Sequence, residues 1–524
     1  MTENANDKST EACPVSAKND LSAWILDAEE AAVDDGALTP SESGAGTVAK
    51  SIQISKKAVI VGVAVILILF FAAYAATFIF EKGMYARDAA GAIIPGTYVE
   101  DPSLPGISWW QFLLSPFMIL LPSSPGYETV YAIIALLLII GAIFTALDDT
   151  GILVYMVEAL NNKFGKKKYI LLFVLPFVFM FLGSSAGMFE ELIPLVPVVI
   201  MLSYALGWDA LIGLGITILA SCFGFAAGVV NPFTVGVAQT LGGIPLYSGI
   251  ELRLLTFVIA YIILMAFLFA YARKLDKNPR KSSVYAADLE KKAMFAFRTD
   301  TFVKSKEKNR AMLWFGSWML SIVVLAVISV FVQALAQNLM YITLGVYLVA
   351  GIGACFICGT KLKRLCKMLL KGFLTLLPAI AMILFAGGIR YIIEKGDVMD
   401  TILYNAVGLM SGQPSFVVTL LIYLIIFIFE MFIPSGSAKA FLLMPMVFNI
   451  CTLTGIDKQV AVLAFHFADG FANVILPTNA GLLLILGMTT VDYGKWFRWS
   501  IKIQLTLLAA TIGVLALAQF VVYA

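Results

Sequence analysis

Long apolar runs constrain this chain more than any other feature of its sequence. Ala58–Phe80, Val130–Leu147 and Leu254–Tyr271 each reach the roughly 18 mostly apolar residues that a helix needs to cross a membrane. Only 13% of the 524 residues are charged, whereas a soluble domain carries about a quarter. The sequence therefore predicts an all-α polytopic membrane protein.

The basic residues predict which loops face the cytoplasm, because lysine and arginine accumulate on that side of short loops. Lys50, Lys56 and Lys57 precede the first apolar run and place the N-terminus inside. Residues 1–57 hold ten Asp and Glu against five Lys and Arg, and we expect them to form a disordered acidic cytoplasmic tail. Residues 273–311 carry twelve basic and five acidic side chains, so they are also expected to be cytoplasmic.

Two apolar segments are too short to cross the bilayer. Tyr169–Leu182 spans fourteen residues, about 21 Å as a helix, against a hydrocarbon core of roughly 30 Å. The break GSSAGMFEE follows, and the chain then resumes an apolar run. Phe416–Phe429 is also fourteen residues long and meets the break EMFIPSGSAK. We expect two re-entrant hairpins, at 169–206 and 416–453, that enter from opposite faces of the membrane.

The remaining segments complete a predicted topology of about nine transmembrane helices plus the two hairpins. A first repeat is expected over 58–272, where a broken helix at 209–245 follows the hairpin. A basic cytoplasmic loop and a linking helix occupy 273–338. The second repeat, 339–524, has its broken helix at 458–487, and the C-terminus is expected outside.

A shift of 248 residues aligns the two halves of the chain without a gap. The identical pairs are Phe181 with Phe429, Pro197 with Pro445, Gly207 with Gly455, Asp209 with Asp457, Phe223 with Phe471, and Asn231 with Asn479. The second half starts on the opposite side of the membrane, which predicts an inverted-topology repeat of the kind found in many secondary transporters. Because broken helices are tolerated at membrane depth where they line a cavity, the tips and breaks are expected to meet around one hydrated site.

Side-chain oxygens beside the two helix breaks are candidate metal ligands. Asn231 and Thr234 stand in VNPFT, and Thr478 and Asn479 stand in LPTNA. Sodium binds oxygen ligands of this kind, together with carbonyls freed at an unwound turn. Capping of the broken helix ends is the alternative role of these residues. We expect sodium or a proton as the coupling ion and no other cofactor.

Polar residues at the hairpin tips and on the second broken helix are candidate substrate ligands. Serines there can bind a carboxylate or simply favour turns, and intramembrane carboxylates are functional candidates by default. Lys439 either pairs with a substrate carboxylate or extends toward the membrane surface. His466 and Asp469 lie one helical turn apart and form either a proton-coupling or a structural pair. The candidate set comprises Ser184, Ser185, Glu190, Glu191, Ser435, Ser437, Lys439, Asp469 and Asn473.

Three other charged residues are expected to be structural. Asp209 and Asp457 follow the hairpins and are expected to cap helix N-termini. Arg253 is expected to mark the start of a helix at the external face.

The stretches GMFEELIPLVP, NPFTVGVAQTLGGIPLYSGIELR, PSGSAKAFLLMP and FADGFANVILPTNAG carry a family resemblance. They resemble the YfcC-type carriers of the C4-dicarboxylate anaerobic carrier-like family, in the ion transporter superfamily. The likeness covers about residues 58–522. It implies a scaffold with a transport domain, elevator-type alternating access, and transport of dicarboxylates or basic amino acids, including arginine/ornithine exchange. His466 and the sequence PTNAG depart from the usual family pattern close to the expected site.

These features predict a secondary active transporter of a small carboxylate-bearing metabolite in the cytoplasmic membrane, and not an enzyme. Basic amino acids are slightly favoured over dicarboxylates, because Glu190, Glu191 and Glu430 outnumber Lys439 at the tips. A channel, or a hydrolase that pairs a serine of GSSAG with His466, is the alternative. No GxxxxGK[ST] phosphate loop is present, which disfavours an ATP-driven pump. The expected partners are the substrate, lipid and a second copy in a homodimer, with no nucleic acid.

Overall fold

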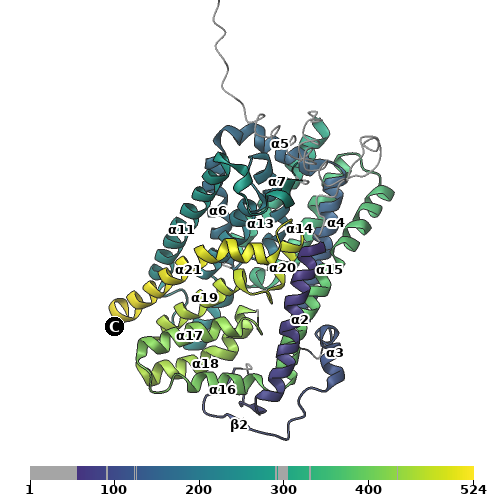
Figure 1. The fold of residues 1–524 in the computed structure, drawn as a ribbon. Helices are drawn as coiled ribbons and strands as arrows, with labels where there is room; N and C mark the ends of the chain where they lie inside the picture. The colour runs from purple at the N-terminus through teal and green to yellow at the C-terminus, as the bar shows by residue number, and fades with distance from the viewer. Residues whose placement is uncertain are drawn as a thin grey trace, which may run out of the picture.

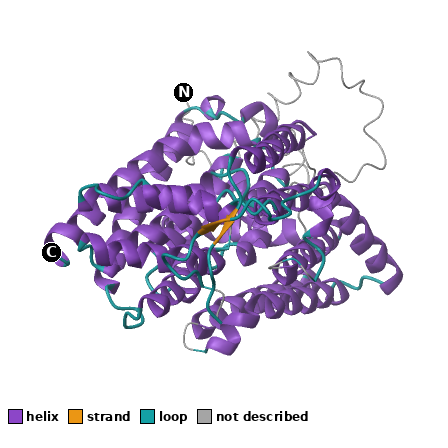
Figure 2. Cartoon of the chain, turned by 90° about the horizontal axis from the view of Figure 1, so that it is seen from below, coloured by secondary structure: helices purple, strands orange, loops and turns teal. Residues whose placement is uncertain are grey.

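The computed structural model describes residues 56–89, 92–122, 124, 127–289, 292, 305–329, 332–433 and 435–524. The tail predicted at 1–57 therefore lies almost wholly outside the described residues. The described chain is almost entirely helical, and the sheet in it has two short strands. In this sheet β1 (Gly83–Met84) pairs antiparallel with β2 (Val99–Glu100), near the centre of the view from below in Figure 2.

The helices follow the order shown in Figure 1. The first half contains α2 (Lys56–Ile79), α3 (Trp109–Met118), α4 (Tyr127–Asp149), α5 (Ile152–Phe164), α6 (Lys168–Ala186), α7 (Val196–Ala205), α8 (Ala210–Leu214), α9 (Ala220–Ala227), α10 (Val237–Gly242) and α11 (Ile250–Lys277). The second half contains α13 (Lys306–Ser329), α14 (Gln333–Ile357), α15 (Leu362–Lys395), α16 (Met399–Gly408), α17 (Ser415–Phe429), α18 (Gly436–Thr454), α19 (Lys458–Ile475), α20 (Ala480–Gly487) and α21 (Tyr493–Leu517). Short 3₁₀ turns occupy Gly165–Lys167, Glu190–Leu195 and Pro279–Lys281, and π-helical turns occupy Gly215–Leu219, Pro232–Gly236 and Ala518–Val522.

The described helices include five that are long and apolar enough to cross a membrane, or six if the bent pair α4–α5 counts as one span. The axes within that pair differ by 76°. The all-α membrane class predicted from the sequence is confirmed, whereas the predicted number of nine crossings is not. Outward-facing helices expose large apolar side chains, such as Ile68, Val258 and Leu505, as expected for surfaces that contact lipid.

The two segments predicted as hairpins lie at opposite ends of the molecule. In Figure 1, α7 is near the top with α5, and α17 and α18 are near the bottom with α16 and the sheet. The first arm is longer than predicted, because α6 continues through Ser184 and Ser185 to Ala186. Gly187 then turns the chain at φ +62°, a left-handed conformation that favours glycine. Ser184 and Ser185 are therefore helical, where the sequence predicted a turn.

The two predicted broken helices are both interrupted at the predicted places. The first has α8, a π-helical turn and α9, and then breaks at 228–231 before a second π-helical turn leads into α10. The second breaks at 476–479, between α19 and α20. Asp209 caps α8 by accepting from the N–H of Ile212, and Asp457 caps α19 by accepting from Gln459. Both aspartates thus have the capping role predicted for them.

Glycines allow the central helices to pack backbone against backbone. A Cβ added to Gly470 in α19 would overlap the backbone of Ala226 in α9. A Cβ on Gly224 would overlap the carbonyl group of Met180 in α6. Because backbone atoms have no rotamer by which to move aside, α6, α9 and α19 can approach this closely only at glycine.

Candidate functional site

Three charged side chains form a buried cluster in the second half. The ammonium of Lys439, in the first turn of α18, lies 2.5 Å from the Oδ1 atom of Asp469 in α19. It also pairs with the carboxylate of Glu430, directly after α17. All three are nearly inaccessible, with exposed fractions of 0% for Lys439 and 1% for each acid. Lys439 therefore pairs internally and does not extend to the membrane surface, and this triad has two acids for one base.

The tip of the first hairpin closes over the first helix break. The hydroxyl of Ser184 accepts from the N–H of Val229 at 3.0 Å, and the Ser184 carbonyl accepts from Val230 at 3.3 Å. Ser185 donates to the carbonyl of Phe181 in its own helix. Ser184 thus satisfies backbone donors that the break leaves without helical partners.

Each hairpin also contacts the break of the other half. A Cβ on Gly436, at the second tip, would lie 2.6 Å from Cγ2 of Thr234 in the first break. A Cβ on Gly481, just after the second break, would lie 2.6 Å from Cε1 of Phe189 at the first tip. The structure therefore places each tip beside the break of the other half.

Asn231 and Thr234 begin the segment that follows the first break. The side-chain oxygen of Asn231 accepts from the N–H groups of Phe233 and Thr234, at 2.9 Å and 3.4 Å. The Nδ2 atom of Asn231 and the hydroxyl of Thr234 are buried and have no hydrogen-bond partner among the described residues. The side-chain oxygen of Asn231 therefore caps the helix end, which is the alternative role predicted for it. The NH₂ group of Asn231 and the hydroxyl of Thr234 form no hydrogen bond with the described residues.

The second break is more fully bonded. Asn479 accepts from the N–H of Leu482 at 2.8 Å, and its Nδ2 donates to Asn473 at 2.5 Å. Asn473 donates in turn to the carbonyl of Asp469 at 3.0 Å. The buried hydroxyl of Thr478 has no partner. The side-chain amides of Asn473 and Asn479 thus both form hydrogen bonds within the protein. The role of Thr478 and Asn479 as sodium ligands stays a prediction.

The remaining candidates at the tips have less defined positions. Ser435 caps α18 by accepting from the N–H of Ala438 at 3.4 Å, and Ser437 is partly buried in the first turn. The backbone of Glu190 and Glu191 starts a 3₁₀ turn, but their side chains lie outside the part of the chain that the structure describes. The described residues contain no group of three His, Cys, Asp or Glu side chains that could hold a metal.

His466 is buried beside the first break, but it does not pair with Asp469. Its Nδ1 atom bonds to the carbonyl of Val462 at 2.8 Å, while Nε2 has no hydrogen-bond partner among the residues described. Ser184 and Ser185 bond elsewhere, so the serine–histidine contact that a hydrolase needs is not formed.

Arg253 and Glu430 also lie at this site, although neither is among the substrate or metal ligands predicted from the sequence. Arg253 is fully buried, not a surface marker, and donates to the carbonyls of Val229, Ser248 and Tyr247. Arg253 therefore occupies the carbonyl of Val229, a backbone acceptor at the first break. The sequence did contain a signal for both, since each stands within or beside the motifs NPFT…ELR and PSGSAK.

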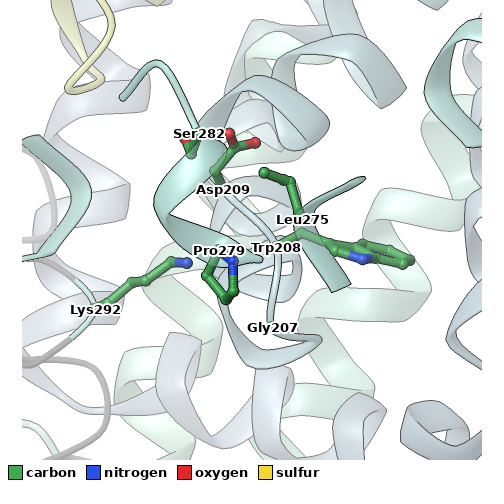
Figure 3. Close-up of a pocket in the computed structure, with 7 residues that line it drawn as sticks. All are labelled: Gly207, Trp208, Asp209, Leu275, Pro279, Ser282 and Lys292. Carbon is green, nitrogen blue, oxygen red and sulfur yellow. Dashed lines mark hydrogen bonds between the residues drawn. The ribbon is translucent and has the colours of Figure 1, made fainter. Parts of the chain in front are cut away.

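A second polar cluster lies where the loop after α11 meets the end of α11 and the start of α8, around a small pocket lined by Gly207, Trp208, Asp209, Leu275, Pro279, Ser282 and Lys292 (Figure 3). Asp209 accepts from Tyr271 and Ser282 at 2.7 Å and 2.6 Å. Nearby, Asp288 accepts from Tyr204, from the N–H of Ala210, and from Thr490 of the second half. Burial raises the pKa of Asp288 to about 6, and burial lowers the pKa of Lys292 to about 8. The bonds of this cluster tie the loop after α11 to both halves.

Comparison with known proteins identifies the family. The family described as C4-dicarboxylate anaerobic carrier matches residues 59–520, nearly the whole described chain. The chain belongs to this carrier family. It is therefore a multi-pass membrane transporter and not an enzyme, and family membership implies no cofactor.

Two curated relatives of this carrier cover similar parts of it. One, from Escherichia coli K12, is named "Putative basic amino acid antiporter YfcC"; it is 31% identical over 395 residues, 72% of this chain and 75% of the relative. The other is an uncharacterized protein of Haemophilus influenzae, 24% identical over 372 residues, 70% of this chain and 71% of the relative.

Two solved transporter structures are similar to the carrier over most of its length. The YdaH transporter of Alcanivorax borkumensis has a TM-score of 0.43 and 16% identity, covering 88% of this chain and 97% of that one. MtrF of Neisseria gonorrhoeae, whose structure is described as illuminating a class of antimetabolite efflux pumps, has a TM-score of 0.41 and 15% identity, covering 88% and 95%.

Proposed function

We propose that this carrier is a secondary active exchanger of basic amino acids in the cytoplasmic membrane, with its N-terminus inside and its C-terminus outside. The substrate binds where the two hairpin tips meet the two helix breaks. The observation that carries the proposal is the buried triad, in which the carboxylates of Glu430 and Asp469 face the single ammonium of Lys439.

The charge of the triad favours a cationic substrate over a dicarboxylate. Two carboxylates and one ammonium leave one excess negative charge in a buried position. At about 4 Å and an effective dielectric constant of about 20, one further unit charge gains or loses about 4 kcal/mol. The guanidinium or ammonium of a basic amino acid balances the excess, whereas each carboxylate of a dicarboxylate adds to it. The name of the Escherichia coli relative, a putative basic amino acid antiporter, supports the same substrate class.

The arrangement of the halves supports alternating access of the elevator type. Both hairpins are proposed to be re-entrant, within an inverted repeat that pairs each tip with a break. Because Lys439, Asp469 and Asn231 are buried, substrate reaches them only after the tips move. We further propose that two copies associate as a homodimer.

Exchange in proteoliposomes tests this function. Vesicles loaded with arginine should take up labelled arginine or ornithine, and vesicles loaded with malate should not. Asp469→Asn should abolish uptake, while Asp457→Asn, which changes only the cap of the same helix, should retain it. Exchange of malate or fumarate without arginine would replace the amino-acid proposal with the dicarboxylate function, and uptake that fails to saturate would indicate a channel.

A further inference from the structure

The amide of Asn231 has a fixed orientation. Its oxygen accepts from two backbone N–H groups, those of Phe233 and Thr234, which only the oxygen end of the amide can do. Its NH₂ end therefore points away from the cap. This end is buried and has no hydrogen-bond partner in the part of the chain that the structure describes, and the same holds for the hydroxyl of Thr234.

These unused groups suit an anion better than a cation. An NH₂ group is a donor only, so it cannot coordinate sodium, and the oxygen of Asn231 already serves two donors. The carbonyl of Val229, which an unwound turn would otherwise offer to a cation, accepts from Nε of Arg253 at 3.2 Å. The guanidinium of Arg253 also brings a positive charge to this break, which attracts an anion and repels sodium.

The unused groups lie next to the acidic triad. The point that a Cβ of Gly436 would occupy is 2.6 Å from Cγ2 of Thr234 and 3.0 Å from Oδ2 of Asp469. The side chains of Thr234 and Asp469 are thus both neighbours of Gly436, Thr234 through its methyl carbon. Side chains this close together can contact the α-carboxylate and the α-ammonium of one amino acid, because a single carbon atom joins those two groups.

We propose that Asn231 and Thr234 form the subsite for the α-carboxylate of the substrate, with Asp469 receiving the adjacent ammonium group. Asn231 donates from Nδ2 and Thr234 from its hydroxyl. Gly187 permits the first tip to approach, since a Cβ there would lie 2.8 Å from Oδ1 of Asn231. This inference rests on the proposed function, and it assigns to the substrate a position that the sequence assigned to sodium.

Binding of arginine and of agmatine, its decarboxylated analogue, tests the subsite on the purified full-length carrier. Thr234→Val removes the hydroxyl and keeps the shape. Asn231→Asp keeps the capping oxygen and replaces the donor with a negatively charged acceptor. Both should weaken arginine binding, by about tenfold to a hundredfold for one hydrogen bond to a charged group. Agmatine binding should be unchanged in Thr234→Val, and Thr256→Val, which alters a buried threonine of α11, should leave both ligands unaffected.

If Thr234→Val weakened the binding of arginine and of agmatine equally, the proposed subsite would be wrong, because the hydroxyl would then not contact the carboxylate. A rise in the unfolding temperature with sodium chloride over choline chloride, lost in Thr234→Val, would overturn it in favour of a sodium site. If the wild-type carrier binds malate and not arginine, the proposed function fails on its own. The subsite then predicts weaker malate binding in both variants, and unchanged malate affinity would refute it.

Discussion

Phe223 and Phe471, which stand 248 residues apart at equivalent positions of the two halves, pack edge to face with ring centroids 6.1 Å apart. Phe223 lies in α9 and Phe471 in α19, next to the backbone contact between Ala226 and Gly470. In the proposed inverted repeat, a residue that touches its own equivalent lies near the axis that relates the halves. The proposed binding residues, such as Asn231 and Asp469, likewise come from both halves.

Gly470→Ala should disrupt the crossing of the two broken helices. The added Cβ overlaps the backbone of Ala226, which can yield only by moving α9 as a whole. We expect a loss of about 1–3 kcal/mol in stability, as for other overpacked interiors, together with loss of transport. Thermal unfolding in detergent measures the first and exchange in proteoliposomes the second.

Gly513→Ala is the matched control, because a Cβ there meets nothing within 4 Å in the helix α21. It should raise stability by about 0.5–1 kcal/mol through its higher helix propensity. A stable, active Gly470→Ala variant would mean that α9 and α19 are not in close backbone contact in the functioning protein.

Thr234→Val should stabilise the substrate-free carrier. Its hydroxyl is buried without a partner, and replacing such a group with a methyl group of the same shape removes a penalty of about 1–3 kcal/mol. Chemical or thermal denaturation without substrate measures this gain. Thr256→Val, which deletes a hydroxyl bonded to Leu252, should show no gain. A lower stability of Thr234→Val would show that its hydroxyl has a partner in the resting state.

Glu430→Gln should allow net transport without exchange. With arginine absent, the triad retains one excess negative charge, and moving this buried charge with the binding site is costly. The substitution removes the excess charge of the substrate-free site. The empty carrier can then change between its inward-facing and outward-facing states without substrate. Efflux of labelled arginine into arginine-free buffer should then approach the rate of exchange, whereas the wild type should require external arginine. Glu394→Gln, which alters a more exposed ion pair with Arg390, should behave as wild type.

Asp288→Asn should remove a pH dependence of stability. Burial raises the pKa of Asp288 to about 6, so the folded protein binds this proton more tightly than the unfolded chain. The stability from this group is fully present below about pH 4, the ordinary pKa of the carboxyl, and is lost as the pH rises through about 6.

Unfolding temperatures measured between pH 4 and pH 7 test this dependence. The wild type should lose roughly 2–3 kcal/mol across the interval, from a shift of about two pKa units. Asp288→Asn should have a flatter profile in that range. A steeper decline in the variant than in the wild type would contradict the assignment.

The sequence predicted the features that depend on local chemistry. Asp209 and Asp457 cap helices as expected. The breaks fall at Asn231 and Asn479, because a proline nearby interrupts a helix and each Asn caps the start of the next one, by rules that act within a few residues. The short helices α5 and α16 were not predicted from their own composition. The shift of 248 residues aligns these two helices, since it places Ile152, the first residue of α5, on Asp400 in α16.

Contacts between distant segments could not be read from the sequence in the same way. Lys439 was expected to pair with substrate or extend outward, because nothing local indicates that Asp469, thirty residues later, lies beside it. Arg253 was expected at a surface, because an arginine that follows a loop usually marks one. Both assignments depend on how the helices pack, which no local pattern encodes.

The hydrogen bonds of Arg253 have a mechanical consequence. If α9 continued through the break as a regular helix, the carbonyl of Val229 would accept from a backbone N–H of that helix. The buried guanidinium of Arg253 would then lose one of its acceptors. The loss of one hydrogen bond to a charged group costs about 1.5–3 kcal/mol, so the interrupted form is favoured over a continuous helix. We therefore expect the interruption to persist while the carrier changes conformation.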